Sequence, residues 1–367
     1  MKILHVGNLK SGIDTYVRNT VAMADDRFDF VIVNGADDNN KPYYRHGKEV
    51  KNYHICLYRA LNPLKDLKAL IQTIKIIRRE KPDLIHCHSA KGGVIGRFAA
   101  FFTHKKSVYT PHAFSFLSAE SSKKRQIYLL LERVAKLNSR LLACSESERE
   151  LGIKEIPYPK SKAYAWPNAI PAIQNQDILE PKDLKELGQY IISVGRPSYQ
   201  KNPLLMVETM RIIHQKYPEI NFLLVGVGYY SPMLSEMQAL IEKYQLQNVM
   251  KLLPWCSHEE TLGYVKHSLF YLTTSLYEGL PIAVLEAMAL GKAIVSSDVI
   301  GNKDCVKDNY NGYLLSMDNK AFADGCITLI ENPEKRDTMG QNSLQLFQQN
   351  FLIDNRIKDL ENIYLNV

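Results

Sequence analysis

Short apolar segments alternate with amphipathic segments along almost the whole chain, and this alternation constrains the fold more than any other feature. Apolar runs such as Asp83–His88 and Tyr190–Val194 are separated by stretches with helical spacing, for example Leu64–Arg79. Strands that are almost continuously apolar are expected where helices cover both faces of a parallel sheet. The pattern therefore predicts a parallel α/β architecture built from successive strand–helix units.

The predicted strands form two series, separated by a polar, proline-containing stretch at Ala172–Gly188. The first series is Lys2–Val6, Phe28–Val33, His54–Tyr58, Asp83–His88, Ser107–Thr110, Arg140–Cys144 and Ala163–Trp166. The second is Tyr190–Val194, Asn221–Val225, Val249–Leu253, Leu269–Thr274, Ala293–Ser296 and Gly312–Leu315. A chain of 367 residues is long enough for two ordinary domains.

We therefore expect two Rossmann-like, doubly wound domains that face a central cleft, at 1–172 and 173–349. The final helical stretch, from about Pro333 to Leu365, is a candidate to cross back, so that a helix at about 350–367 packs on the first domain. Ligands of such folds bind beyond the carboxyl ends of the strands.

Composition places the chain among globular proteins, with 46% hydrophobic and 23% charged residues. No apolar run approaches the roughly 18–20 residues of a membrane-spanning helix. The first residues predict a strand and its turn rather than a signal peptide. The six cysteines contain no CxxC pair, which favours free thiols in a reducing compartment. We therefore expect a cytoplasmic protein, with peripheral attachment to the inner face of the cell membrane left open.

Positive charge is concentrated in the first half of the chain. Residues 1–175 contain 29 Lys and Arg against 16 Asp and Glu, whereas the remainder contains 17 against 23. Such a basic half favours an anionic partner, either acidic lipid or nucleic acid. No nucleic-acid-binding module accompanies it, so we expect no nucleic-acid partner.

The segment Ser121–Leu141 reads as a helix with an apolar face and with basic residues directed largely elsewhere. The apolar face is Ile127, Leu130, Leu131, Val134, Leu137 and Leu141, and the basic residues are Lys123, Lys124, Arg125, Arg133, Lys136 and Arg140. Phe98, Phe101, Phe102, Lys105 and Lys106 add similar groups nearby. This segment could lie on an anionic membrane. An amphipathic helix packed on its sheet is the favoured interpretation.

The strongest local motif is Ser275–Gly291, in which an apolar strand ends, a Gly-Pro turn follows and a helix begins. The backbone N–H groups at such a helix start form an anion site. Glu278 lies in the turn, where it can accept hydrogen bonds from sugar hydroxyls, and Glu286 lies about two helical turns later, where it can hold a ribose diol. The alternative is a structural turn in which Glu278 complements the helix dipole.

A second motif, Gly195–Pro203, follows the first strand of the second series. It contains Arg196, whose planar guanidinium can donate two parallel hydrogen bonds, and Lys201, whose ammonium is a compact cation. This combination suits two adjacent phosphates. The alternative is a pair of solvated loop cations.

In the first half, Gly7–Gly12 is a degraded glycine-rich turn that lacks both GxGxxG and the P-loop pattern. His86, His88 and His112 lie at the ends of two predicted strands, and alternation places His86 and His88 on one face. Three histidines suggest zinc as one possibility. No Cys or carboxylate lies at metal-ligand spacing around them, so we expect no metal.

Together these segments resemble the retaining glycosyltransferase family 4, of GT-B fold, and within it the bacterial capsule and exopolysaccharide enzymes. The similarity covers nearly the whole chain in order. It rests on "KPDLIHCHSAKGGVIGRFAA" and "VYTPHAFSF" in the first half, and on "SVGRPSYQKNP", "LLVGVG", "SLYEGLPIAVLEAMALGKAIVSSDVIGNKDCV" and "NGYLL" in the second.

The resemblance implies a role for each matching residue. Arg196 and Lys201 would bind the donor diphosphate, Glu286 the ribose hydroxyls and Glu278 the donor sugar. The remaining residues implied in donor binding or catalysis are Gly279, Leu280, Pro281 and Ile282 near sugar and phosphate, His112 beside the reacting sugar, and Gly12, which would leave room for phosphates or acceptor. Three positions depart from the family's glycines: Ser11, Ala113 and Asn202.

By resemblance, the expected activity is transfer, with retention, of a sugar from a nucleotide diphosphate sugar, favoured as a UDP-sugar. The acceptor would be a glycan or a polyprenyl-diphosphate-linked glycan of capsule, exopolysaccharide or O-antigen synthesis. No convincing DxD motif lies at a strand end, so Arg196, Lys201 and the helix start are expected to replace a metal, without cofactor. A nucleotide-sugar epimerase and a non-catalytic nucleotide-sugar-binding protein remain as alternatives.

Overall fold

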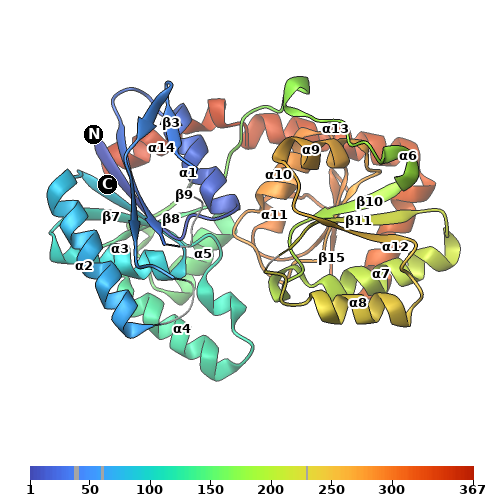
Figure 1. The fold of residues 1–367 in the computed structure, drawn as a ribbon, viewed down its shortest axis with the longest axis horizontal. Coiled ribbons are helices and arrows are strands. Elements are labelled where there is room, and N and C mark those ends of the chain that lie inside the picture. Colours follow the sequence, from blue (N-terminus) through green and yellow to red (C-terminus); the bar gives the residue numbers. More distant parts are fainter. Residues whose placement is uncertain (37–40, 59–61, 229) are drawn as a thin grey trace. The chain divides into compact units, whose positions relative to one another are not determined.

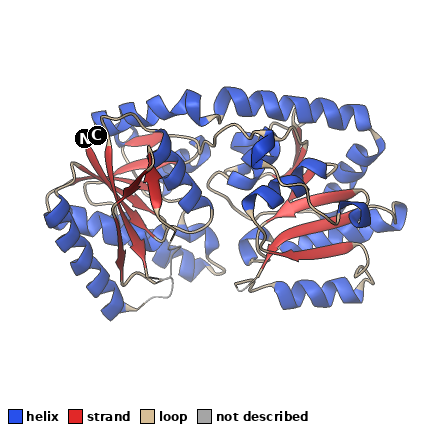
Figure 2. Cartoon of the chain, turned by 45° about the horizontal axis from the view of Figure 1, so that its top comes forward, coloured by secondary structure: helices blue, strands red, loops and turns tan. Residues whose placement is uncertain are grey.

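The computed structural model describes residues 1–36, 41–58, 62–228 and 230–367. The chain divides into two compact units. Unit 1 comprises Met1–Pro171 together with Ile353–Val367, and unit 2 comprises Ala172–Leu352. Each unit consists of a sheet with helices packed against it (Figures 1 and 2).

Unit 1 is built on a parallel sheet of seven described strands in the order β5-β2-β1-β6-β7-β8-β9. The strands are β1 Lys2–Gly7, β2 Asp29–Gly35, β5 Asn52–Ile55, β6 Leu84–His88, β7 Lys106–Thr110, β8 Arg140–Ala143 and β9 Ala163–Ala165. The helices are α1 Gly12–Met23, α2 Pro63–Glu80, α3 Ala90–Phe102, α4 Ser122–Ala135, α5 Glu146–Glu155 and α14 Ile353–Asn366. Alternate residues of β1 enter different cores: Leu4 and Val6 pack on one face, and Ile3 on the other.

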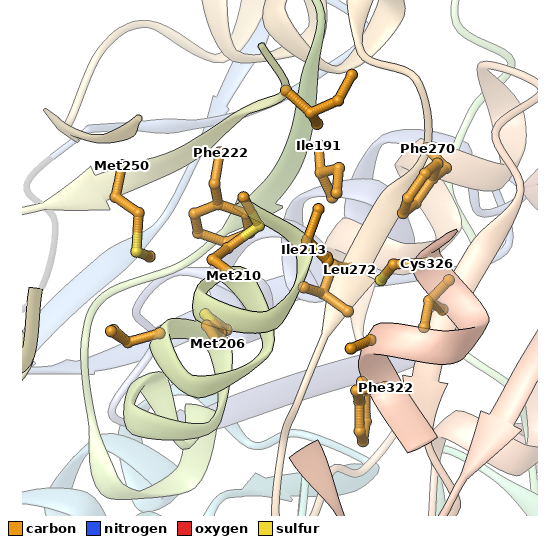
Figure 3. Close-up of a cluster of buried hydrophobic side chains, with 14 of the residues drawn as sticks. Ile191, Met206, Met210, Ile213, Phe222, Met250, Phe270, Leu272, Phe322 and Cys326 are labelled. Carbon is orange, nitrogen blue, oxygen red and sulfur yellow. The ribbon is translucent and has the colours of Figure 1, made fainter. Parts of the chain in front are cut away.

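Unit 2 contains a parallel sheet of six described strands in the order β12-β11-β10-β13-β14-β15. The strands are β10 Tyr190–Val194, β11 Asn221–Val227, β12 Met250–Pro254, β13 Tyr271–Thr273, β14 Ile294–Ser297 and β15 Gly312–Leu315. The helices are α6 Leu184–Leu187, α7 Pro203–Lys216, α8 Leu234–Lys243, α9 His258–His267, α10 Ile282–Ala289, α11 Asn302–Cys305, α12 Asn319–Glu331 and α13 Pro333–Asn350. Figure 3 shows part of its core, in which Met206 and Met210 of α7 face Phe222 of β11.

The prediction of parallel α/β architecture is thus confirmed in both units, and most predicted strands lie within two residues of the observed ones. One edge strand is displaced: the predicted His54–Tyr58 is β5, Asn52–Ile55. The ladder ends there because the N–H of Cys56 donates to Oε1 of Gln72 (2.9 Å) instead of to a strand. A short antiparallel hairpin, β3 Tyr43–Arg45 and β4 Lys48–Val50, was not predicted.

The predicted final helical stretch is two helices, because the chain breaks at Phe351 and Leu352 between α13 and α14. Helix α14 belongs to unit 1, and its apolar face (Ile353, Ile357, Leu360 and Tyr364) is buried in the core beneath β1 and β2. Nε1 of Trp166 donates to the carbonyl of Arg356 (2.9 Å), and Nζ of Lys106 donates to the backbone oxygen of Val367 (2.7 Å). These contacts hold the end of the chain against the sheet.

Helix α4 contradicts the favoured interpretation of the segment Ser121–Leu141. The helix ends at Ala135, and Leu141 is a buried residue of β8. Four of the apolar residues expected to pack on the sheet are exposed: Ile127 (58%), Leu130 (62%), Leu131 (49%) and Val134 (55%). The helix instead buries Leu129, Glu132 and Ala135. No helix of the described chain has both the length and the apolar character needed to cross a bilayer.

Candidate active site

In unit 2, two loops meet because β10 and β13 are neighbours in the parallel sheet, so their carboxyl ends lie side by side. The N–H of Leu276, after β13, donates to the carbonyl of Gln200, after β10 (2.8 Å). The hydroxyl of Thr274 donates to the carbonyls of Lys201 and Asn202 (2.9 and 3.0 Å). The two motifs singled out in the sequence therefore form one constellation.

Lys201 and Glu278 form an ion pair at the centre of this constellation, with 2.7 Å between Nζ and Oε1. The Glu278 carboxylate is also held by the hydroxyl of Ser275 (2.8 Å) and by Nε2 of Gln200 (3.1 Å). Glu278 is 6% exposed, so its charge is stabilised by these three donors rather than by bulk water. Lys201 is consequently not a merely solvated cation.

The backbone around Glu278 is supported by the turn after β14. The N–H of Glu278 donates to the carbonyl of Ile300 (3.2 Å). Gly301 has φ of +85°, and a Cβ at this position would lie 2.7 Å from the carbonyl oxygen of Gly279. Only glycine fits without displacing the Glu278–Gly279 turn. Gly301 is not among the residues predicted for the site, although it is a glycine that follows the predicted strand Ala293–Ser296.

Arg196 lies at the start of the β10 loop, with its guanidinium carbon 5.1 Å from the centre of the Tyr230 ring. Arg196, Lys201 and Gly195 line a small hollow at the end of β10, together with Pro197 and other residues. The loop thus holds two cations at the carboxyl edge of the sheet, where ligands of parallel sheets bind.

Glu286 lies on α10, and the residues before it, Gly279, Leu280 and Pro281, lead into the first turn of that helix at Ile282. Helix starts carry partial positive charge and orient N–H groups toward anions. Nε2 of His258, at the start of α9, lies 2.8 Å from Oε1 of Glu286, and this hydrogen bond raises the pKa of His258. His258 was missed in the sequence because the contact joins residues of two different helices.

In unit 1, His112 follows β7 in a strained turn. Both His112 (φ +53°) and Ala113 (φ +81°) have left-handed backbone conformations, which favour glycine. Glu148 holds this turn by accepting the N–H of Ala113 at Oε1 (2.7 Å) and the N–H of Cys144 at Oε2 (2.8 Å). Strained backbone held by its surroundings is typical of functional sites. Glu148 was not identified from the sequence.

Gly12 is the first residue of α1 and follows Ser11, which has φ of +51°. Serine therefore adopts here a conformation that the family's usual glycine would adopt more easily. Ser89 (φ +61°) adopts a similar conformation at the turn after β6.

Four histidines converge on one face of the unit 1 sheet. His5 pairs with His86 in the β1–β6 register, and the His86 and His88 rings lie 4.0 Å apart, as alternation along the strand predicts. Nδ1 of His5 lies 2.8 Å from Nε2 of His88, and Nδ1 of His88 lies 3.1 Å from Nε2 of His112. Burial lowers the pKa values of His5 and His112 to about 3 and those of the other two well below 6.5, so all four rings are neutral.

Ligand atoms of His5, His86 and His88 lie within 4.8 Å of one another, which is close enough to consider a metal ion. However, both nitrogens of His86 are hydrogen-bonded, to Tyr364 and Thr110 (2.8 Å each), and both nitrogens of His88 are hydrogen-bonded to histidines. Only Nε2 of His5 is left without a hydrogen-bond partner among the described residues, and within the described chain no carboxylate or thiol joins the group. The residues present fit a hydrogen-bonded cluster better than a metal site.

Comparisons with known proteins agree with this architecture. A model of Glycosyltransferase Family 4 matches residues 10–172, and one of Glycosyl transferases group 1 matches residues 174–345. An Escherichia coli UDP-Gal:alpha-D-GlcNAc-diphosphoundecaprenol alpha-1,3-galactosyltransferase is 29% identical over 326 residues, 85% of this chain and 82% of that one. The Staphylococcus aureus capsular polysaccharide biosynthesis glycosyltransferase CapM is 25% identical over 335 residues, 87% of each chain.

Solved structures share the fold along the whole chain. Sucrose-phosphate synthase from Thermosynechococcus elongatus superposes with a TM-score of 0.83 at 17% identity, covering 100% of this chain and 98% of that one. HepE from Anabaena, solved with UDP and glucose, superposes with a TM-score of 0.81 at 18% identity, covering 100% of both. With matching family models on both units and two parallel-sheet α/β domains of the GT-B type, the chain belongs to glycosyltransferase family 4 and is a glycosyltransferase.

Proposed function

We propose that this enzyme transfers a sugar from a UDP-sugar, with retention at the anomeric carbon, onto a lipid-linked or glycan acceptor of cell-surface polysaccharide synthesis. Two relatives support the acceptor class, since the Escherichia coli galactosyltransferase acts on a diphosphoundecaprenol-linked sugar and CapM acts in capsular polysaccharide biosynthesis. The donor class is supported by the same Escherichia coli enzyme, which uses UDP-Gal, and by HepE, which was solved with UDP-glucose.

The Lys201–Glu278 ion pair is the observation that carries the proposal. An arriving diphosphate competes for the Lys201 ammonium, which releases part of the Glu278 carboxylate to accept hydrogen bonds from the donor-sugar hydroxyls. Ser275 and Gln200 keep the carboxylate in place during this exchange. One contact thus links recognition of the phosphates to recognition of the sugar.

Three further groups complete the donor site in this proposal. Arg196 binds the diphosphate bidentately, the start of α10 at Ile282 faces the phosphates, and Glu286 accepts the ribose hydroxyls while His258 fixes its orientation. Gly12 and His112 of unit 1 are assigned to the reacting end, with His112 beside the transferred sugar. All these assignments follow the family pattern at matching positions.

The chemistry then needs charge stabilisation more than a nucleophile. The bond from the anomeric carbon to the diphosphate oxygen breaks, the acceptor hydroxyl oxygen bonds to that carbon on the same face, and its proton passes to the departing diphosphate. Arg196, Lys201 and the helix dipole stabilise the growing negative charge as preorganised electrostatics, without a metal.

Transfer from radiolabelled UDP-sugars to a polyprenyl-diphosphate-linked sugar tests the assignment directly. We expect Lys201→Ala and Glu278→Gln to lower transfer by at least about 100-fold, as for removal of a transition-state contact. Lys216→Ala is the matched control, because this exposed lysine pairs with Glu331 elsewhere in unit 2 and should leave transfer unchanged. Near-normal rates in both site variants would reject the phosphate and sugar assignments. Conversion of the donor sugar without acceptor would favour an epimerase instead.

We also propose that α2, α3 and α4 of unit 1 form a docking face for anionic membrane. Helix α3 packs against both α2 and α4 (Figure 1). Exposed apolar side chains are present on all three helices: Leu64, Leu67 and Ile71 on α2, Phe101 and Phe102 on α3, and Ile127, Leu130, Leu131 and Val134 on α4. Exposed apolar side chains on adjacent helices are typical of an interaction surface.

Charge favours a bilayer as the occupant of this face. The three carboxylates on these helices are each paired with a cation: Asp66 with Lys91 (2.5 Å), Glu80 with Lys51 (3.1 Å) and Glu132 with Arg97 (2.9 Å). Exposed lysines and arginines remain around the apolar groups, among them Lys65, Lys68, Lys75, Lys123 and Arg133. Apolar residues bordered by cations fit anionic lipid.

Sedimentation with lipid vesicles tests this docking face. Binding should require phosphatidylglycerol, weaken as salt is raised, and fall in Ile127→Ser/Leu130→Ser, whose side chains are already exposed. Leu179→Ser is the control, since Leu179 on unit 2 is exposed to a similar extent. Equal binding to neutral vesicles would reject the electrostatic contribution, and undiminished binding of the double variant would reject the face itself.

A further inference from the structure

The buried histidines of unit 1 form a continuous row that leads to His112. His5, His88 and His112 are joined by two direct imidazole–imidazole hydrogen bonds of 2.8 and 3.1 Å. We propose that His5 and His88 are positioning residues that fix the proton of His112 on Nδ1, so that His112 presents an N–H donor. The inference rests on the proposed function only in placing His112 beside the transferred sugar.

His86 sits beside the row but takes no part in it. The hydroxyl of Thr110 donates its single proton to the carbonyl of Leu142 (2.6 Å), so it must accept from His86. The proton of His86 is therefore on Nε2, and the bare Nδ1 accepts the hydroxyl of Tyr364 (2.8 Å). Both nitrogens of His86 are thereby committed, and the His5–His88–His112 row is independent of it.

Within the row, the two hydrogen bonds must run in the same direction. A neutral imidazole has one proton, so His88 donates through one nitrogen and accepts through the other. In the outward direction, Nδ1–H of His5 donates to His88, Nδ1–H of His88 donates to His112, and the proton of His112 is on Nδ1. In the inward direction every proton moves to Nε2. The tautomer of His112 therefore cannot change unless those of His5 and His88 change with it.

The closed end of the row at His5 selects the outward direction. His5 is fully buried, and its Nε2 has no hydrogen-bond partner among the described residues. The inward direction would leave an N–H donor orphaned there, whereas the outward direction leaves only an unfilled acceptor. Among buried backbone groups, orphaned N–H donors are rarer than under-satisfied carbonyl acceptors, and we infer the same preference for the imidazole nitrogens. At the other end, half-buried His112 can meet substrate or water through Nδ1.

The outward direction suits the chemistry at His112. An Nδ1–H donor can bond a sugar hydroxyl or an oxygen that gains negative charge during transfer, and it does so without adding a buried positive charge. The strained turn held by Glu148 fixes the backbone of the same residue. Backbone and tautomer are thus set by two separate sets of partners.

Nitrogen-15 NMR of histidine-labelled full-length protein near pH 7 measures the tautomers directly. We expect a protonated Nδ1 and a bare Nε2 for His5, His88 and His112, and the reverse for His86. A protonated Nε2 on His112 in the wild-type protein would overturn the proposal, and no variant is needed for this test.

His88→Leu then tests whether the row controls His112. We expect the proton of His112 to redistribute toward Nε2, and kcat to fall roughly fivefold to tenfold, the cost of one neutral hydrogen bond, with little change in donor KM. His5→Phe, which removes the first donor, gives a second variant should His88→Leu not fold. An unchanged His112 tautomer in the folded variant would reject control by the row.

His112→Ala separates this proposal from the proposed function. If that variant transfers sugar normally while the wild-type tautomers are as expected, the row exists but His112 has no role in transfer.

Discussion

The fully buried His5 makes the stability of unit 1 depend on pH in a calculable way. Burial lowers the pKa of His5 to about 3 in the folded chain, whereas the unfolded chain has the ordinary value of 6.5. Below pH 6.5, the unfolded state therefore binds a proton that the folded state does not. The free energy of unfolding is greatest above pH 6.5 and falls as the pH drops toward 3.

The size of this loss follows from the pKa difference. At pH 5, the pH is 1.5 units below the pKa of His5 in the unfolded chain. Each unit is worth about 1.4 kcal/mol, so His5 alone lowers the free energy of unfolding by about 2 kcal/mol. Burial shifts the pKa values of His86 and His88 in the same direction, so the total loss exceeds this figure. A domain stability of roughly 5–15 kcal/mol makes such a loss easy to measure.

Urea unfolding at pH 7, 6 and 5 measures the effect, with Trp166 as the reporter. Trp166 is buried in unit 1, and replacing the only other tryptophan, the exposed Trp255 of unit 2, by phenylalanine confines the signal to unit 1. His5→Asn should lose about 2 kcal/mol less than the parent between pH 7 and pH 5. A free energy of unfolding that is the same at pH 7 and pH 5, or an identical pH dependence in parent and variant, would refute the reasoning.

Three further substitutions have expected outcomes that follow from single contacts. Arg97→Met should lower the stability of unit 1 by about 3–5 kcal/mol in urea unfolding, because it leaves the Glu132 carboxylate buried without its cation; a loss below 1 kcal/mol would contradict this. Tyr364→Phe should lower the free energy of unfolding by about 1–2 kcal/mol, because it leaves Nδ1 of His86 without a hydrogen-bond partner. An unchanged stability would mean that this nitrogen bonds to another group. Gly301→Ala should weaken UDP binding in calorimetry at least severalfold, because its Cβ displaces the Glu278 turn, and wild-type affinity would show that the turn tolerates it.

The sequence allowed the sheets to be predicted because their strands are buried on both faces and therefore almost continuously apolar. Ile3, Val31 and Ile85 lie in such runs, and each is fully or almost fully buried. The edge strand β5 was misplaced because its residues Asn52–His54 are polar or half-exposed, which weakens the pattern.

The environment of α4 could not be predicted, since helical spacing of apolar residues does not reveal what covers them. Ile127 and Leu130 have the spacing of a core face but are exposed, and the helix buries Glu132 because Arg97 and Tyr109 hold its carboxylate.

Some residues of the candidate site could be predicted from the sequence, and others could not. Lys201 and Glu278 lie in local motifs, and each was predicted from its own motif. Glu148, His258 and Gly301 support the site through contacts with residues distant in the sequence, and these contacts depend on strand order and on helix placement.

The most direct test of donor binding is a thermal-shift measurement of the purified protein with UDP, GDP, ADP, CMP and a panel of sugar nucleotides, in the presence of EDTA. A ligand that binds the native state raises its melting temperature by mass action. We predict a shift with UDP and UDP-sugars that persists in EDTA, is lost in Lys201→Ala and is retained in the control Lys216→Ala. Absence of a shift with every nucleotide, or an undiminished shift in Lys201→Ala, would contradict the proposed donor site.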